Sequence, residues 1–327
     1  MGELSKRRKK PPSISILEKE SSVSFLPLFR VEIVDRLKDC FLLWEKFSPK
    51  RNLFDLWEFR YAFYLGYRYQ PYFFVLKEAQ KEVGLLPLWY NSQRKKFFWF
   101  GSDWQEEVSF YVKDKKYIKR LLEIAPSPLL LNAITKEGIE DLISSLPLQK
   151  DEPKYILNLK NFKNHEDFLK TLKKNARRNL RKDRNRILKQ NPTIIFDDFS
   201  YFPKLIEISK KRFAKKGQET DWKDPRIITT FEKVISLSGK SYKARMIAVK
   251  IKGEIAGVDL IALYNKTYFC LKCGYDVENF PGVGNFVNLL EIDDAIKLGM
   301  EKIDFLQNSY QWKEKYFTPL ELFKFEK

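Results

Sequence analysis

The chain has 327 residues, of which 44% are hydrophobic and 15% aromatic, so it can bury a sizeable core and is a folded protein of about two domains. Lys and Arg number 61 against 43 for Asp and Glu, a net charge of +18. This surplus indicates an anionic partner such as phosphate, nucleic acid, an anionic polymer or a membrane face. A charge that serves solubility or heat resistance alone is the alternative.

The few cysteine and histidine residues exclude several kinds of site. Cys40, Cys270 and Cys273 form no disulfide framework, and two thiols three positions apart cannot close a zinc site. In a strand, Cys270 and Cys273 are expected to point to opposite faces. The one histidine, His165, stands at a predicted helix start and is expected at the surface, which excludes Ser-His-Asp and Cys-His catalysis. We expect no metal and no permanently bound cofactor.

The N-terminal segment is predicted to be a disordered basic arm over residues 1–20, with the run KRRKK at 6–10. It has no apolar h-region, and no stretch of about 18 apolar residues occurs in the chain. We therefore expect a cytoplasmic protein without a transmembrane segment, with peripheral association at the inner membrane face as an alternative.

Residues 21–150 are predicted to form a first domain with three strands at its centre. Strand, turn, strand, turn and strand follow one another within 71–102. The other expected elements are helices at 36–47, 54–67, 115–124 and 138–146 and a strand at 128–134.

Residues 151–327 are predicted to form a second domain of the α/β class with an antiparallel meander. Tight turns at Lys252-Gly253 and Asn265-Lys266 join three strands. The expected elements are strands at 154–159, 242–251, 254–264, 267–276, 303–307 and 321–327 and helices at 164–191, 202–217, 225–239 and 284–298.

The two halves share part of this plan. The segment KEVGLLPLW at 81–89 is in step with GEIAGVDLIA at 253–262, and each follows a strand and a turn. An internal duplication explains this match, with the boundary near residue 150. The alternative is that any two β-hairpins look alike.

A glycine-containing turn before the helix at 284–298 is the first candidate site. Gly282 and Gly284 allow the backbone to approach an anion without a Cβ clash. The free N–H groups of the first helical turn and the positive end of the helix dipole would complete an anion site. An ordinary Pro-Gly turn is the alternative.

The order of short motifs in the second half resembles a known family. GYD at 274–276, FPGVGNF at 280–286, IDFLQN at 303–308 and YQWKEKYF at 310–317 follow one another as in the FemAB and BioF2-like branch of the GNAT acyltransferase superfamily. The resemblance is good from about 154 to 317 and weak before 150. It implies two tandem GNAT-like domains, each a mixed, largely antiparallel sheet flanked by helices.

The resemblance also implies a co-substrate. GNAT enzymes bind the pyrophosphate of acyl-CoA at a turn that corresponds here to Asn279, Gly282, Val283, Gly284 and Asn285. Asn279 departs from the Arg or Gln that is usual at its position. Because some members of the FemAB branch take the acyl group from aminoacyl-tRNA, acyl-CoA and aminoacyl-tRNA both remain open as donors.

Lys313 resembles the lysine that this branch has after its aspartate-bearing strand, and we expect it to stabilise an oxyanion or contact a substrate phosphate. Asp304 is the candidate carboxylate, as base or as orienter of Lys313. The substrate-contacting candidates are Tyr275, Asp276, Gln307 and Tyr310. A solvated surface lysine and a turn aspartate are the alternatives for Lys313 and Asp276.

The helix at 164–191 is strongly basic. Arg177, Arg178 and Arg181 are predicted to bind an anionic substrate, either the phosphates of a nucleotide-linked acceptor, a tRNA or an anionic polymer. A solvated helix face is the alternative. No aromatic residues are interleaved in its basic stretch at 172–190, which argues against base reading.

Three functions are consistent with these features. The first is transfer of an acyl group from acyl-CoA to an amine of a sugar-nucleotide or cell-envelope precursor. The second is an aminoacyl-tRNA-dependent transfer by a FemX-like enzyme, and the third is non-catalytic binding of an anionic polymer. We expect a monomer, because two related domains already lie in one chain.

Overall fold

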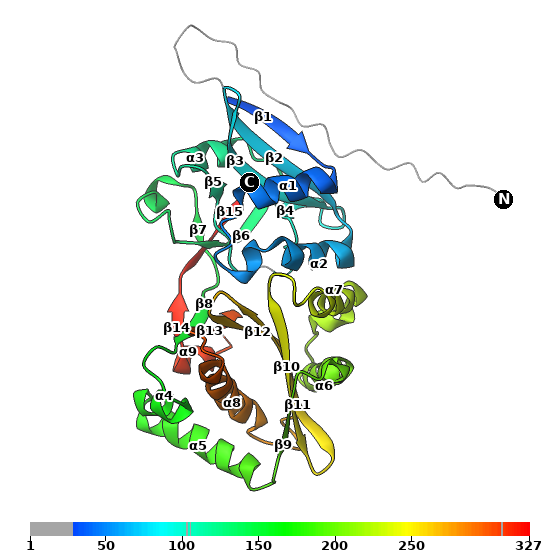
Figure 1. Ribbon diagram of the computed structural model, residues 1–327, viewed down its shortest axis with the longest axis vertical. Coiled ribbons are helices and arrows are strands. Elements are labelled where there is room, and N and C mark those ends of the chain that lie inside the picture. The colour runs from blue at the N-terminus through cyan, green and yellow to red at the C-terminus, as the bar shows by residue number, and fades with distance from the viewer. Residues whose placement is uncertain (1–28, 103, 105, 309) are drawn as a thin grey trace, which may run out of the picture.

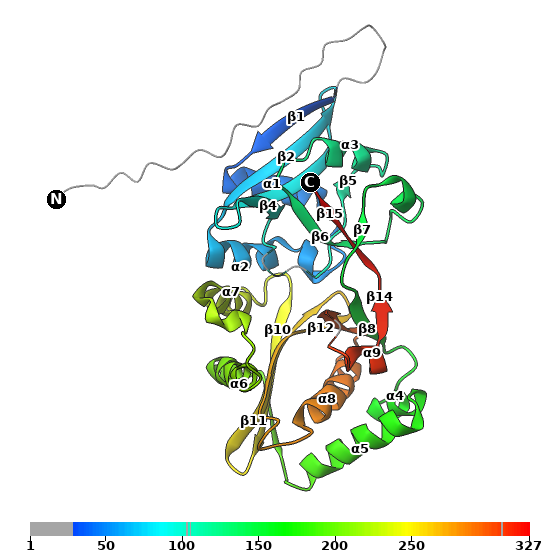
Figure 2. The ribbon, with the colours of Figure 1, turned by 180° about the vertical axis from the view of Figure 1, so that it is seen from behind.

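The computed structural model describes residues 29–102, 104, 106–308 and 310–327, and Figures 1 and 2 show them as two stacked lobes. The predicted basic arm at 1–20 lies outside the described residues. A single apolar core crosses the boundary between the lobes through helices α2 (Trp57–Tyr67) and α7 (Pro225–Ser236). The rings of Phe63 and Phe231, one from each lobe, have centroids 6.1 Å apart.

The first lobe is built on an antiparallel sheet in the order β1-β2-β3-β4, with β5 paired to β3. The helix predicted at 138–146 is wrong, because only a 3-10 turn at Ile143–Ser145 forms after Gly138, whose φ is 83°. The elements are β1 Phe29–Val34, β2 Gln70–Glu78, β3 Lys81–Asn91, β4 Lys96–Trp99, β5 Tyr111–Val112, α1 Leu37–Phe47 and α3 Tyr117–Glu123.

The C-terminal strand returns to the first lobe. β15 (Leu322–Glu326) lies between β6 (Leu130–Thr135) and β7 (Gln149–Lys150) in a three-stranded sheet. Its Phe323 and Phe325 are buried in the first-lobe core. The last strand, which the sequence places in a domain spanning 151–327, thus packs with the other half of the chain, as Figure 1 shows.

The second lobe holds a seven-stranded sheet in the order β14-β8-β13-β12-β11-β10-β9, in which only β12 and β13 are parallel. Helices α6 and α7 cover one face, and α8 covers the other, with α4 and α5 outside α8. The elements are β8 Lys154–Asn158, α4 His165–Thr171, α5 Lys174–Leu188, β9 Thr193–Phe196, α6 Phe202–Lys215, β10 Lys243–Ile251, β11 Glu254–Tyr264, β12 Thr267–Tyr275, α8 Val283–Lys297, β13 Lys302–Gln307, α9 Lys313–Tyr316 and β14 Thr318–Leu320.

The long helix predicted at 164–191 is instead two helices. Leu172 and Lys173 are extended, with ψ values of 153° and 145°, and separate α4 from α5. The hydrophobic spacing fits a continuous helix, but the break allows both helices to contact α8 at different places. Tertiary packing has therefore overridden the local pattern.

Two predictions about single residues are also wrong. His165 begins α4 as expected but is buried, because Asp293 of α8 accepts hydrogen bonds from its backbone N–H and lies 2.6 Å from its ring nitrogen Nδ1. Cys270 and Cys273 lie on the same face of the sheet, the one that α8 covers. A β-bulge at Leu271 shifts the register between them, which reverses the alternation expected of a regular strand.

The predicted duplication has a structural counterpart in the two hairpins β2–β3 and β10–β11. In the first, Leu76 pairs with Gly84 and the register then shifts by one residue; in the second, Val249 pairs with Gly257 and the register shifts at the same place. A bulge at the same position of the same hairpin is a specific feature that unrelated hairpins do not share by default.

Candidate functional site

The sheet of the second lobe opens between its two parallel strands. β12 and β13 pair only where Thr267–Phe269 meet Lys302–Asp304, although β12 continues to Tyr275 and β13 to Gln307. Beyond this pairing the two strands no longer bond to each other. Side chains of the second lobe and of the first-lobe segment that carries Glu106 meet there.

Lys154 is the centre of a buried ion cluster at this opening. Its ammonium group contacts the carboxylates of Asp304 and Glu107. Burial alone would lower the pKa of Lys154, but the two carboxylates outweigh burial and raise it. Asp304 is therefore held in an ion pair with a residue that the sequence analysis did not connect to it.

Glu106 is a second buried acid of the first lobe, 4% exposed. Its Oε2 accepts a hydrogen bond of 2.5 Å from the backbone N–H of Gln307, at the end of β13. Burial raises the pKa of Glu106 to about 7, although the Gln307 N–H and the nearby Lys313 ammonium oppose the shift. A carboxyl with this pKa can take up or release a proton near neutral pH.

Lys313 is also buried, with 5% of its surface exposed. Its ammonium group donates hydrogen bonds to the backbone carbonyls of Phe305, Leu306 and Gln307, at 2.5, 3.3 and 2.7 Å. These three bonds use all the donors of an ammonium group. Lys313 thus fixes the end of β13, where Leu306 has a φ of 66°. Tyr310, whose ring lies 5.3 Å from Lys313 Nζ, is 58% exposed.

The predicted anion turn is covered by a carboxylate of the chain itself. Gly282 is the N-cap of α8 with a φ of 92°, and a Cβ added to it would lie 2.8 Å from Cβ of Asp183 on α5. Asn285, in the first turn of α8, donates a hydrogen bond of 2.7 Å to Asp183. Arg186 donates to the carbonyl of Pro281. Arg186 also lies 3.6 Å from the Asp183 carboxylate, so an incoming pyrophosphate would have to displace the side chain of Asp183 from this ion pair.

Tyr275 is held at the end of β12 by a buried acid pair. Its hydroxyl donates a hydrogen bond of 2.5 Å to Asp259, and its ring lies against Gly257 and Gly284. Asp259 is in contact with Glu291 of α8, and burial raises the pKa of both carboxyls. The pair therefore retains a shared proton between the sheet and α8.

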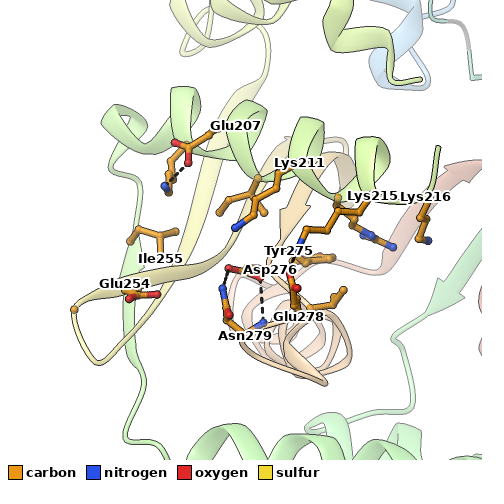
Figure 3. Close-up of a pocket in the computed structure, with 15 residues that line it drawn as sticks. Glu207, Lys211, Lys215, Lys216, Glu254, Ile255, Tyr275, Asp276, Glu278 and Asn279 are labelled. Carbon is orange, nitrogen blue, oxygen red and sulfur yellow. Dashed lines mark hydrogen bonds and ion pairs between the residues drawn. The ribbon is translucent and has the colours of Figure 1, made fainter. Parts of the chain in front are cut away.

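A cavity of about 520 Å³ opens beside the same strand end (Figure 3). Tyr275, Asp276 and Asn279 line it, together with α6 and the turn between β10 and β11. Asn279 donates a side-chain hydrogen bond of 2.7 Å to Asp276. Gly282, Gly284 and Lys313 are not among its lining residues. The structure thus brings together only part of the predicted site.

The basic helix presents its arginines unevenly. Arg178 is exposed, Arg177 is partly buried, and Arg181 forms an ion pair with Glu166 at 2.5 Å. Leu180 and Ile187 hold α5 against the rest of the lobe. This arrangement leaves a basic surface on α5 without a cavity of its own among the described pockets.

Comparison with known proteins decides the family resemblance. Residues 174–314 match the acetyltransferase (GNAT) domain. This part of the chain is similar to that domain. No curated protein matches the sequence significantly.

Solved structures share the fold over most of the chain. FemX is similar with a TM-score of 0.60 and 13% identity, over 90% of this chain and 97% of FemX. L-PGS from Bacillus licheniformis gives a TM-score of 0.54 and 12% identity over 89% and 91%. A tandem GNAT protein from the clavulanic acid biosynthesis pathway gives 0.51 and 10% over 91% and 98%. The predicted fold of two tandem GNAT-like domains is confirmed.

Sequence reasoning missed Glu106, Glu107 and Lys154, which lie outside the motifs and meet only in three dimensions. The pair of acids after Trp104 is a weak signal that a motif search does not weigh. In the described ranges, no group of three or more His, Cys, Asp or Glu side chains is placed to hold a metal ion. No helix in the part of the chain that the structure describes is long and apolar enough to span a bilayer.

Proposed function

We propose that this GNAT protein is an N-acyltransferase that moves an acyl or aminoacyl group to an amine acceptor at the opening between β12 and β13. The observation that carries the proposal is Glu106, a buried carboxyl with a pKa of about 7 at the end of β13. Amines are protonated at neutral pH and must lose a proton before they attack, so the reaction needs such a group.

In the proposed step, the amine nitrogen forms a bond to the acyl carbonyl carbon, and the ester or thioester bond of the donor breaks. The nitrogen releases two protons in all: the first passes to Glu106 and on to solvent before the attack, and the second passes from the tetrahedral intermediate to Glu106 and from there to the leaving oxygen or sulfur. Tyr310 is the exposed side chain of this group and can reach a substrate. Lys313 acts as a positioning residue, because it holds the backbone whose Gln307 N–H binds Glu106.

Replacing Glu106 with Gln tests this role, since the amide keeps the shape but cannot accept the proton. We expect kcat/KM to fall about 10²- to 10⁴-fold, with a melting temperature no lower than that of the wild type. Glu123→Gln, an exposed acid of the same lobe, is the matched control and should leave the rate unchanged. A Glu106→Gln rate within threefold of the wild type would rule out the proton transfer.

The donor is a separate proposal. The sequence favours acyl-CoA, but Asp183 beside the turn at 281–285 supports the second candidate, an aminoacyl ester of tRNA, because the Asp183 side chain occupies the space beside Gly282 that a pyrophosphate would need. The exposed arginines of α5 would then contact tRNA phosphates. Thermal shift with CoA and with aminoacyl-tRNA compares the two donors. Stabilisation by CoA in the wild type, equal to that in Asp183→Asn, would contradict the tRNA proposal.

A further inference from the structure

Strand β1 of the first lobe has a free side. It pairs with β2 in register over all six of its residues, and it ends the strand order β1-β2-β3-β4. Figures 1 and 2 show it at the margin of the first lobe, away from the second lobe. Every second residue of such a strand directs its backbone N–H and C=O groups away from the neighbouring strand. One row of backbone groups of β1 therefore has no strand beside it in the part of the chain that the structure describes.

Other sheet edges in the described ranges are shorter or covered. β5 has two residues, β9 has four and follows Pro192, and β14 has three, one of which is Pro319. β6 has six residues, but backbone hydrogen bonds with Val108 cover its outer side. Short strands and Pro hinder pairing with another chain. β1 has neither feature: it contains no Pro, Gly or bulge, and its four central side chains are exposed.

One face of β1 carries an apolar row. Phe29, Val31 and Ile33 alternate along the strand and therefore point to the same side of the sheet. Phe29 packs on Tyr117 of α3, with 6.3 Å between the ring centroids, but Val31 and Ile33 are 43% and 40% exposed. Side chains of this kind are stabilised by neighbours on an adjacent strand. A further strand beside β1 would provide such neighbours for Val31 and Ile33.

The other face of β1 carries one exposed cation and one exposed anion. Arg30 lies opposite Lys77 of β2 in the strand register, and like charges at opposite positions repel each other. Lys77 forms an ion pair with Glu32, whereas Arg30 forms none within 4.0 Å with any residue that the structure describes. A carboxylate on the free side of β1 would therefore stabilise Arg30.

The sequence of β1 is complementary to itself. When two copies of β1 pair antiparallel with Val31 opposite Val31, Phe29 lies opposite Ile33 and Arg30 lies opposite Glu32 of the second copy. A two-fold axis passes through the Val31 pair, so each of the other pairs occurs twice. A slip by one residue would turn the apolar row of one copy to the charged face of the other. The pattern of side chains thus favours a single register.

We propose that β1 joins two copies of this chain into a symmetric dimer, with one sheet continuous through both first lobes. The occupant of the free edge is a second copy, because Arg30 and Glu32 complement each other in this register, whereas an unrelated strand would have to supply both charges. The contact is independent of the proposed acyl transfer, since Glu106 takes no part in it, and it replaces the monomer expected from the two related domains.

Sedimentation equilibrium of the full chain tests the dimer. We expect the wild type to pass from monomer to dimer as its concentration rises. Arg30→Glu should weaken this association about tenfold, because both symmetric pairs then become pairs of like charge. Lys113→Glu makes the same charge reversal on an exposed residue after β5, on the other side of β3 from β2, and should leave the association unchanged. A wild type that stays monomeric, or equal losses in the two variants, would overturn the proposal.

A mixture of two variants distinguishes pairing of β1 with itself from every other contact. Arg30→Glu makes both charged positions of β1 acidic and Glu32→Arg makes both basic, so each variant alone repels its own copy. In an equal mixture, opposite charges meet at both pairs, and we expect a heterodimer, detected by sedimentation velocity with one variant fluorescently labelled. Both positions are exposed, so the variants should remain folded, which urea unfolding checks. If residues 1–28 of the same chain occupy the edge, or if the dimer forms elsewhere, the mixture associates no more than its components, and the proposal is wrong.

Discussion

The two hairpins β2–β3 and β10–β11 have the same bulge, yet the chain continues from them in different ways. β4 has 4 residues and ends seven positions before Glu106, whereas β12 has 9 residues and is followed by the turn into α8. In the first lobe, the helix that comes between β4 and β6 is α3, with 7 residues, whereas α8 has 15.

Two lobes with the same hairpin can therefore contribute different groups to one site. The second lobe retains the parallel opening between β12 and β13, and the first lobe supplies two acids to it, Glu106 and Glu107. The first lobe also depends on the second half of the chain for β15. The lobes are thus related in fold and unequal in chemistry.

The largest effect should come from removing residues 321–327. The first lobe would lose the central strand of its small sheet and the buried Phe323 and Phe325, so we expect its stability to fall by more than about 5 kcal/mol. Urea unfolding followed by tryptophan fluorescence measures this. Glu321→Ala, an exposed change, is the control. An unchanged urea midpoint in the truncated chain would show that the first lobe does not depend on β15.

Breaking the ion cluster at the junction of the lobes should be the next largest effect. Lys154→Met would leave Asp304 and Glu107 buried without their cation, at a cost of about 3–5 kcal/mol in the free energy of unfolding. Lys160→Met removes an exposed lysine from the same half and should cost less than about 1 kcal/mol. Similar losses in the two variants would mean that the cluster contributes no more than a surface pair.

The buried acid of the first lobe should make stability depend on pH. Burial raises the pKa of Glu106 from 4.5 to about 7 on folding. The stabilisation that protonated Glu106 gives the folded state is therefore fully present below pH 4.5 and is lost as pH rises through 7. At about 1.4 kcal/mol per tenfold change in the acid constant, the loss is about 3 kcal/mol. Glu106→Gln should flatten this part of the urea stability profile.

Activity distinguishes Glu106 from the acid pair of the second lobe. As a base, Glu106 should make kcat/KM rise with pH around 7, and this rise should disappear in Glu106→Gln. Asp259→Asn should change stability and leave the pH midpoint of kcat/KM in place, since Asp259 holds Tyr275 and is not among the groups that shift the pKa of Glu106. A shifted midpoint in Asp259→Asn would mean that the acid pair of the second lobe also controls the pH dependence of kcat/KM.

The sequence predicted the elements that depend on local hydrophobic pattern and on the order of the motifs. The meander β10–β12, its two tight turns, α8 and β13 are confirmed, because hydrophobic period and turn residues specify them. The break at Leu172 and the bulge at Leu271 could not be predicted, since they depend on packing against α8 and on register. Glu106 and Lys154 meet across 48 positions of sequence, where spacing carries no signal.

The smallest effect, and the finest test of the comparison, should come from the two bulge glycines. A Cβ at Gly257 would lie 3.0 Å from the ring of Tyr275, which the Asp259 hydrogen bond and Gly284 prevent from moving, whereas one at Gly84 would lie 3.2 Å from a methyl group of Val112. We expect Gly257→Ala to cost about 1–2 kcal/mol and Gly84→Ala less, measured by urea unfolding. Equal stability costs in the two variants would show that the shared bulge is packed equally tightly in both lobes, so that the two lobes would differ only in the segments after the hairpins.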